Sequence, residues 1–292
     1  MNTQDLKIFE AVATQSSFTK AAEATFTVQS NVTARVRSLE EEFGSPLFER
    51  NTRKVSLTPA GEILMHYSRQ ISHLINEAKK EIKSADGLMG SLKIGCIETT
   101  MALKVPGILN QFGEIYPQIE LEFKSAMRGD LINDVLNYKL DAAFIPAPLN
   151  VPGLKYEVVA EERLVILAPG ATSSVGALLE QKEMIKIIVF DQGCVFRARL
   201  EAWLSANGIV QYKAIVVNSL EGIINFVEAG LGISVLPLEI ITTYYSGRNI
   251  KTLTMNKSLS SMSTILISRN NVPPSKALEE FINLFKTQTL LP

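Results

Sequence analysis

The chain has 292 residues, enough for two domains of ordinary size, so a single small module is excluded. Hydrophobic residues make up 46 % and charged residues 20 %, a composition that excludes an intrinsically disordered chain. The 29 Lys and Arg residues nearly balance the 30 Asp and Glu residues, so any nucleic-acid site must be a local patch.

Cysteine usage and hydropathy bear on the compartment. Cys96 and Cys194 are too few for a disulfide framework and lack the paired spacing of a zinc site, which favours a reducing cytoplasm. The most apolar stretch, 229–241, contains two glycines, a proline and Glu239, and is shorter than the ~18 apolar residues that a membrane-spanning helix needs. We therefore expect a cytoplasmic protein without a membrane segment.

Three helices are predicted in the first 44 residues. Apolar residues recur every three or four positions from Leu6 to Ala13, and Ser17 offers an N-cap for a second helix. A third run places its apolar stripe on Val32, Val36 and Leu39 and ends near Gly44, a residue suited to a left-handed C-cap.

A small hairpin is expected between residues 50 and 58, before a long helix that begins at Thr58-Pro59 and runs to about residue 86. This helix carries a narrow apolar seam, typical of pairing between two long helices. We therefore expect it to form a dimer through Leu64, Tyr67, Ile71, Leu74, Ala78, Ile82 and Ala85.

The three short helices have the pattern of a helix-turn-helix, whose last helix fits the major groove of DNA. On that reading, base contacts come from Gln29, Ser30, Asn31 and Thr33, and phosphate contacts from Arg35, Arg37, Arg50, Arg53 and Lys54. The same pattern also suits a three-helix bundle with a solvated polar face.

Strands alternate with helices from residue 91 onward, which predicts a doubly wound α/β body. The expected strands are 92–97, 119–123, 142–145, 164–168, 185–190, 214–217 and 233–236, and the expected helices are 101–115, 131–138, 196–206 and 220–229. The pattern leaves open whether these elements form one large sheet or two lobes.

Several motif blocks closely resemble LysR-type transcriptional regulators. They are Ser17-Phe18-Thr19-Lys20-Ala21-Ala22, the run from Val32 to Gly44, Pro46-Leu47-Phe48-Glu49-Arg50, Leu57-Thr58-Pro59-Ala60-Gly61, and the downstream run from Ala229 to Pro237. The resemblance covers the whole chain. It departs at Thr27-Val28-Gln29-Ser30-Asn31, where the family usually has a Val-Ser-Gln-Pro-like start to the third helix.

The resemblance implies three parts: a winged helix-turn-helix DNA-binding domain (1–58), a linker and dimerisation helix (59–90), and a periplasmic-binding-protein-like α/β effector domain (91–292). Within the effector domain, lobe I comprises about 91–162 and 266–292, and lobe II about 163–265. The implied partners are double-stranded operator DNA, a small-molecule effector and other copies of the chain, as a homodimer or homotetramer.

Ligands of open α/β folds lie beyond the carboxyl ends of the strands, where helix N-termini present free N–H groups. This position and the family resemblance predict effector contacts from Thr99, Thr100, Met127, Pro146, Cys194, Val195 and Ser219. Small carboxylates are common effectors in the family, although Glu98 and Asp191 would repel an anion unless Arg128 or Arg197 compensates. For each of the three hydroxyl residues, plain helix capping is an equal alternative.

Other chemistries find little support in the sequence. Cys194 stands at a helix start near Arg197, where a lowered thiolate pKa would allow redox sensing, but no resolving partner is evident. His66 and His73 share a helix face without a third metal ligand, and Gly230-Leu231-Gly232 precedes a strand, unlike a dinucleotide loop. We expect no catalytic residues, cofactor or metal; the alternative is a soluble solute-binding protein with an added dimerisation segment.

Overall fold

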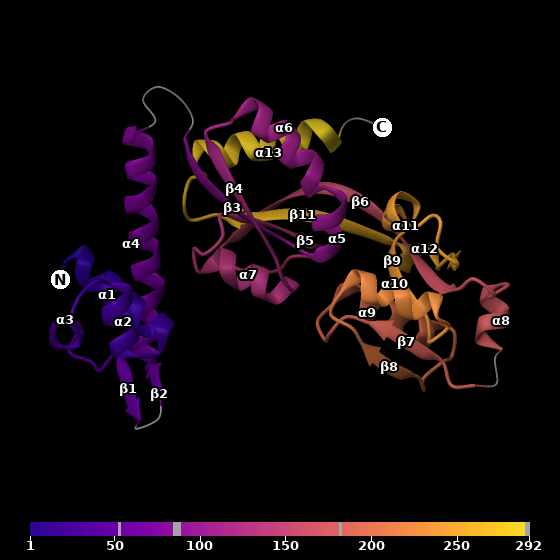
Figure 1. The fold of residues 1–292 in the computed structure, drawn as a ribbon, viewed down its shortest axis with the longest axis horizontal. Helices are drawn as coiled ribbons and strands as arrows, with labels where there is room; N and C mark the ends of the chain where they lie inside the picture. The colour runs from indigo at the N-terminus through magenta and orange to yellow at the C-terminus, as the bar shows by residue number, and fades with distance from the viewer. Residues whose placement is uncertain (52–53, 84–88, 181–182, 290–292) are drawn as a thin grey trace. The chain divides into compact units, whose positions relative to one another are not determined.

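The computed structural model describes residues 1–51, 54–83, 89–180 and 183–289, and the chain divides into two compact units, Met1–Gly87 and Leu88–Pro292 (Figure 1). The first unit holds α1 (Thr3–Gln15), α2 (Phe18–Ala24) and α3 (Gln29–Phe43), then the hairpin β1 (Phe48–Asn51) and β2 (Lys54–Leu57). A long helix, α4 (Pro59–Lys83), completes it. The three helices, the hairpin and the long helix match the expected winged helix-turn-helix and linker helix.

Local sequence signals set the ends of these helices. Asn2 and Asp5 form a reciprocal capping box at the start of α1, and the Thr58 hydroxyl accepts a hydrogen bond from the Gly61 N–H at 3.0 Å at the start of α4. Gly44 ends α3 with a φ of 64°, a conformation that glycine adopts without strain. The core of the unit includes Phe9, Val32, Val36 and Leu39, so one face of α3 is buried.

The second unit has two lobes. In the first lobe, β3 (Gly90–Cys96) pairs in parallel with β4 (Ile119–Ser125) and β5 (Ala142–Pro146), and β5 pairs antiparallel with β11 (Ser261–Arg269). Helices α6 (Val105–Ile115) and α13 (Lys276–Thr289) cover one face of this sheet, and α7 (Arg128–Leu136) covers the other (Figure 1).

One long strand joins the lobes. The 16-residue β6 (Leu154–Pro169) pairs with β11 through residues 154–163, and then with β9 (Ser234–Pro237) and β10 (Ile250–Leu253) through residues 164–169. The second lobe also holds β7 (Lys186–Val189) and β8 (Lys213–Val216), with helices α8 (Val175–Leu179), α9 (Val195–Ala206), α10 (Leu220–Glu228), α11 (Leu238–Tyr244) and α12 (Lys257–Ser260).

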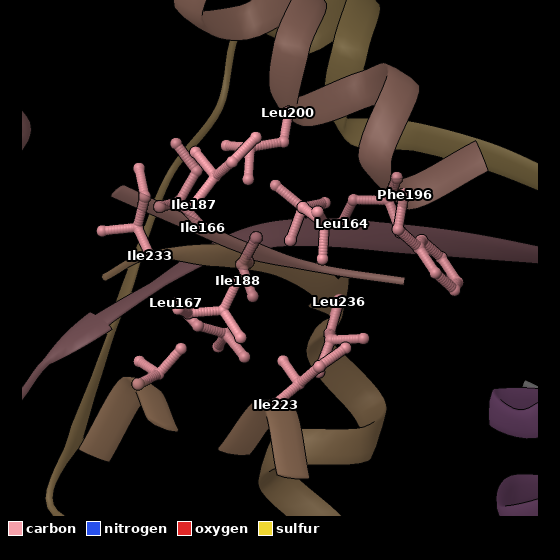
Figure 2. Packing of buried hydrophobic residues seen from close by; sticks show 14 of the residues in the cluster. Leu164, Ile166, Leu167, Ile187, Ile188, Phe196, Leu200, Ile223, Ile233 and Leu236 are labelled. Atoms are coloured by element: carbon pink, nitrogen blue, oxygen red, sulfur yellow. The ribbon is translucent and has the colours of Figure 1, made fainter. Parts of the chain in front are cut away.

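The second lobe has one hydrophobic core, and the first lobe has two, one on each face of its sheet. Figure 2 shows that of the second lobe, where Leu164 and Ile166 of β6 and Ile187 and Ile188 of β7 lie among side chains of α9, α10 and β9. In the first lobe, alternate residues of β5 face opposite ways, so Phe144 packs under α6 and α13 while Ile145 packs with α7. Residues that follow several strands of both lobes line the boundary between the lobes.

Three sequence expectations need correction. The helix expected over 101–115 is interrupted at Lys104, between α5 (Glu98–Leu103) and α6, because Pro106 has no N–H to continue the helical bonding. The strand expected over 164–168 is the second half of β6, whose first half was hidden by its many charged residues. The body is a mixed sheet and not purely doubly wound, since β6 and β11 are antiparallel.

Candidate functional site

The exposed face of α3 begins with polar side chains. Gln29 and Ser30 are exposed in the first turn, and Thr33 and Arg37 follow at helical spacing on the side away from buried Val32 and Val36. Within the described residues, no side chain hydrogen-bonds to the N-terminal N–H groups of α3, which starts after Val28. Donors and acceptors are therefore gathered at one end of the helix.

Two hydrogen bonds fix this end of α3 in place. The Thr19 hydroxyl, from the first turn of α2, donates to Gln29 Oε1 at 3.1 Å, and Asn31 Nδ2 donates to the Thr27 hydroxyl at 2.8 Å. The Thr33 hydroxyl donates back to the Gln29 carbonyl at 3.0 Å. The oxygen of the exposed Gln29 side chain is thus oriented by a neighbouring helix, a link that the sequence pattern did not reveal.

The arginines of α3 have different partners. Arg35 Nη1 lies 2.7 Å from Oδ1 of Asp5, which is buried in α1, whereas exposed Arg37 pairs with exposed Glu41 one turn later. The Arg35 pair joins two helices, so Arg35 has a structural partner that its predicted phosphate contact did not anticipate. Exposed pairs such as Arg37–Glu41 contribute little stability, and the Arg37 guanidinium is accessible to an external anion.

The hairpin basic residues are only partly described. Arg50 pairs in register with Val55, and Lys54 with Asn51, which places both residues near the tip of the hairpin. Their side chains, and the whole of Arg53, lie outside the described residues.

A cavity of about 300 Å³ lies between the two lobes of the second unit. Of the residues predicted for the effector site, the structure brings Thr99, Met127, Pro146, Cys194 and Val195 into its wall, but neither Thr100 nor Ser219. Ten further residues complete the lining: Ile97, Glu98, Ser125, Ala126, Arg128, Phe190, Asp191, Gly193, Phe196 and Asn218.

The two predicted residues outside the wall have structural positions. The Ser219 hydroxyl caps α10, accepting a hydrogen bond from the Gly222 N–H at 3.1 Å, so the capping alternative explains this residue. Thr100 is 3 % exposed and packs inside the protein. Neighbouring Thr99 is 1 % exposed but lines the cavity, and its hydroxyl has no hydrogen-bond partner among the described residues.

A carboxylate of the cavity wall links the two lobes. Glu98, which follows β3 of the first lobe, accepts a hydrogen bond at Oε1 from the Leu220 N–H of α10 in the second lobe, at 2.9 Å. The N-terminus of a helix carries partial positive charge, so this contact is electrostatically favourable. The helix end expected to receive an effector is therefore occupied by a side chain of the protein itself.

The cavity wall holds one guanidinium and a second carboxylate. Arg128 donates from Nε to the Pro146 carbonyl at 3.1 Å and from Nη2 to the Pro148 carbonyl. Asp191 Oδ1 accepts from the Gln192 N–H at 2.7 Å. Arg197 instead pairs with Glu201 on α9 and does not line this cavity.

Burial decides the state of the cysteines. Desolvation raises the pKa of Cys194 above its ordinary value, although the N–H groups of Arg197 and Phe196 and the charge of Arg197 oppose the shift. The lowered thiolate pKa considered for redox sensing is therefore wrong. Burial alone raises the pKa of Cys96 to about 12, so both thiols are protonated at neutral pH.

Both histidines, His66 and His73, lie on α4. His66 Nε2 lies 2.7 Å from Gln70 Nε2 on α4, and the described residues contain no group of three or more potential metal ligands. Of the helices that the structure describes, none combines the length and apolar character needed to cross a membrane.

Two family models match the chain. The model described as the LysR substrate binding domain matches residues 85–289, and the one described as a bacterial regulatory helix-turn-helix protein of the lysR family matches residues 3–62. The HTH-type transcriptional regulators YusT and GltR of Bacillus subtilis are each 35 % identical to the chain. The YusT match covers 98 % of this chain and 95 % of YusT, and the GltR match covers 97 % and 95 %.

Solved structures share the fold. ArgP from Mycobacterium tuberculosis has a TM-score of 0.75 at 16 % identity, over 98 % of this chain and 97 % of ArgP. Full-length CbnR, solved in complex with its target DNA, has a TM-score of 0.69 at 20 % identity, over 98 % of this chain and 99 % of CbnR. With both family models and relatives matched along nearly its whole length, the chain belongs to the LysR family of transcriptional regulators.

Proposed function

We propose that the chain binds duplex DNA through α3 and the β1–β2 hairpin, and that a small organic effector in the interlobe cavity changes this binding. The observation that carries the first half is the exposed polar end of α3, a helix held by a buried opposite face. The second half is supported by the cavity, which has a largely apolar wall and a few inward polar groups, as ligand sites do.

On DNA, we assign base contacts to Gln29, Ser30, Asn31 and Thr33, and phosphate contacts to Arg37, Arg50, Arg53 and Lys54. Gln29 has the amide geometry that pairs with adenine, and its exposed position in the first turn of α3 supports that role. Arg35 is also assigned to a phosphate contact. Its ion pair with Asp5 restricts the positions that the guanidinium can take when the chain binds DNA.

We also propose that α4 pairs two copies of the chain, as a homodimer that assembles into a homotetramer. Tyr67, Leu74 and Ile82 of the expected seam are exposed by 57 %, 52 % and 79 %, whereas Leu64 is buried in its own unit. Exposed apolar side chains in a row along a helix are typical of an interface with another helix. Ala85, the last seam residue, lies outside the described residues.

The division of the chain is part of the proposal: a DNA-binding domain (1–58), a linker helix (59–90) and an effector domain (91–292). β11 begins at Ser261 and pairs with the first half of β6. This pairing supports assigning residues 261–265 to lobe I, so that the chain returns from lobe II to lobe I near residue 260. We further infer that the chain acts in the cytoplasm and catalyses no reaction.

The effector site is assigned to Thr99, Met127, Pro146, Cys194 and Val195. Thr100 and Ser219 act through the packing and capping of the elements that carry this wall. A carboxylate effector would bind near the N-terminus of α7, which no described side chain caps.

DNA binding is tested on a duplex enriched from a random library, with a scrambled duplex as reference. Gln29→Ala is expected to lower discrimination between the two by about 1–3 kcal/mol, the usual value of a paired side chain–base contact. Arg37→Gln is expected to weaken both equally and to reduce the slope of log K against log salt by about 0.9. Unchanged discrimination in Gln29→Ala would reject α3 as the reading helix, and the absence of any selected duplex would favour a solute-binding protein.

The effector half has a separate test. Ala126→Trp places a large side chain in the cavity wall, so it should leave DNA affinity within about twofold while abolishing the response to any metabolite that alters wild-type binding. A retained response would place the effector site elsewhere.

A further inference from the structure

The charged side chains of the cavity wall already make some hydrogen bonds within the protein. Among the described lining residues, Arg128 carries the one guanidinium, and its Nε and Nη2 donate to the backbone carbonyls of Pro146 and Pro148. A guanidinium has five N–H donors, so three of them remain for a ligand. The single positive charge of Arg128 nevertheless stands against two carboxylates in the same wall.

The two carboxylates of the wall each retain one oxygen. Glu98 Oε1 accepts from Leu220, and Asp191 Oδ1 accepts from Gln192, while within the described part of the chain neither Oε2 nor Oδ2 has a hydrogen-bonding partner. Glu98 belongs to the first lobe and Asp191 follows β7 of the second. Acceptors with formal negative charge therefore approach the same cavity from both sides.

Some of the helix N-termini at the cavity already have an acceptor within the protein. The N-terminus of α10 is already bound by Glu98, and the N–H groups of Phe196 and Arg197 at the start of α9 face the thiol of Cys194. Among the described residues, the first turns of α5 and α7 have no side-chain cap, but Glu98 in the one and Asp130 in the other add negative charge. An acid without a cationic group would meet two carboxylates and one arginine in the wall.

A buried hydroxyl of the wall is available to a ligand. The Thr99 hydroxyl is 1 % exposed, lies in the wall and lacks a hydrogen bond within the described structure, as does that of Thr100 outside the wall. A hydroxyl left unsatisfied in the interior costs free energy, and a ligand N–H that donates to the Thr99 oxygen would recover part of it. Apolar residues beside it, including Ile97, Phe190 and Phe196, suit a hydrocarbon body.

We propose that the effector carries a protonated amine, bound between the free carboxylate oxygens of Glu98 and Asp191, on a small apolar body. Glu98 is then a specificity-determining residue, because it rejects simple acids and ties the amine to the contact between the lobes. This inference rests on the proposed function, in which the cavity is the effector site. It replaces the plain carboxylate expected from the family resemblance.

Three probes that share one 3-methylbutyl group test the class of ligand: 3-methylbutylamine, 4-methylpentanoate and 3-methylbutan-1-ol. Binding is followed on the full-length chain through the methyl signal of Met127, which lines the cavity, with exposed Met184 outside it as the reference. At pH 7 the amine is expected to bind with a millimolar Kd, at least about tenfold more tightly than the acid or the alcohol.

The variants separate charge from shape. Glu98→Gln keeps an oxygen acceptor for Leu220 and should weaken the amine about tenfold while strengthening the acid, and Asp191→Asn should do the same more weakly. Glu120→Gln removes one charge from an exposed position on β4 outside the cavity and should change neither probe.

Each outcome is decisive. Tighter binding of the acid, or equal amine affinity in Glu98→Gln and the wild type, would overturn the amine inference while leaving the cavity as a ligand site. No shift of Met127 with any of the three probes would overturn both the inference and the assignment of the effector site.

Discussion

The two candidate sites differ in how their polar groups are used. On α3, Gln29 and Ser30 are exposed, and the Gln29 oxygen accepts a bond from Thr19. Around the cavity, Glu98, Arg128 and Ser219 are all hydrogen-bonded to backbone groups of the protein. The polar groups of the first surface are mostly available to a partner. Those of the cavity wall are partly used inside the protein, and Glu98 Oε2, Asp191 Oδ2 and the Thr99 hydroxyl remain for a ligand within the described residues.

This contrast separates stability from binding. Polar groups committed inside the protein should affect unfolding when replaced, and free polar groups should affect only association with a partner. Variants in each unit test that separation.

The largest effect is expected at Arg269, on β11. Its Nη1 donates to the carbonyls of Val135 and Leu140 at 2.7 and 2.6 Å, and its guanidinium lies 4.4 Å from the centre of the Tyr138 ring. Arg269→Met removes both bonds and the guanidinium that lies 3.7 Å from Oδ1 of Asp141. The Leu140 carbonyl loses this donor, whereas the Val135 carbonyl keeps a bond from the Tyr138 N–H. The variant should lower the free energy of unfolding by about 3–5 kcal/mol in urea titrations. Arg163→Met, at an exposed position on β6, is the control. An equal loss of unfolding free energy in both variants would show that buried hydrogen-bonded groups and exposed groups do not differ in their effect on stability.

A smaller, pH-dependent effect is expected at Glu162, on β6. This side chain is 8 % exposed, its Oε1 accepts a hydrogen bond from Thr264 at 2.5 Å, and its Oε2 has no partner within the described residues. Desolvation raises its pKa above the usual value, against opposing effects of the Thr264 bond and Lys104; the neighbouring Glu239 and Glu161 raise it further.

Because the folded protein binds this proton more tightly than the unfolded chain, stability from Glu162 is complete below its unfolded pKa and falls as the pH rises through the folded value. Glu162→Gln removes that loss and should stabilise the chain by about 1–3 kcal/mol at neutral pH, with little gain near pH 4. Thermal unfolding between pH 4 and pH 8 measures the difference. A gain that is the same at every pH would show that ionisation is not its cause.

The third prediction concerns Thr19, whose hydroxyl orients Gln29. Thr19→Val removes one hydrogen bond at an exposed position and should lower discrimination between selected and scrambled DNA by about 1 kcal/mol, with Tm unchanged. Thr19→Ser keeps the hydroxyl and should retain discrimination. If Thr19→Val instead lowers Tm and affinity for both duplexes, the residue serves only the packing of α2.

The smallest effect is expected at Phe26, between α2 and α3. Its ring is 98 % exposed and its φ is 54°, in the left-handed region that is unfavourable for a bulky residue. Phe26→Asn should raise the free energy of unfolding of the chain by about 0.5–1 kcal/mol. A fall in stability would show that the ring makes contacts that offset the strain.

Local signals predicted the first unit well. A cap starts or ends a helix through hydrogen bonds to residues nearby in the sequence. The structure has the predicted caps at Ser17, Gly44 and Thr58-Pro59. The cavity was harder to predict. Met127, Pro146 and Cys194 were placed by family resemblance, whereas the bond from Leu220 to Glu98 joins residues 122 positions apart, and no periodicity encodes such a pair.

The same limit applies to the strands between the lobes. Residues 155–163 carry alternating charges that resemble a solvated loop, yet they form a strand because β11, about 100 residues later, supplies its hydrogen-bonding edge. Likewise Arg35 was read as a surface cation, since its buried partner Asp5 belongs to the capping box of another helix.

The course of β6 and β11 has a consequence for engineering. The chain leaves the first lobe along β6 and returns to it along β11, so the second lobe is one uninterrupted insertion. Exchanging that insertion between relatives would replace the wall that contributes Asp191 and Cys194 while keeping the wall that contributes Glu98 and Arg128. Such chimaeras would allow the ligand preference of a biosensor to be changed one cavity wall at a time, while the DNA-binding unit stays the same.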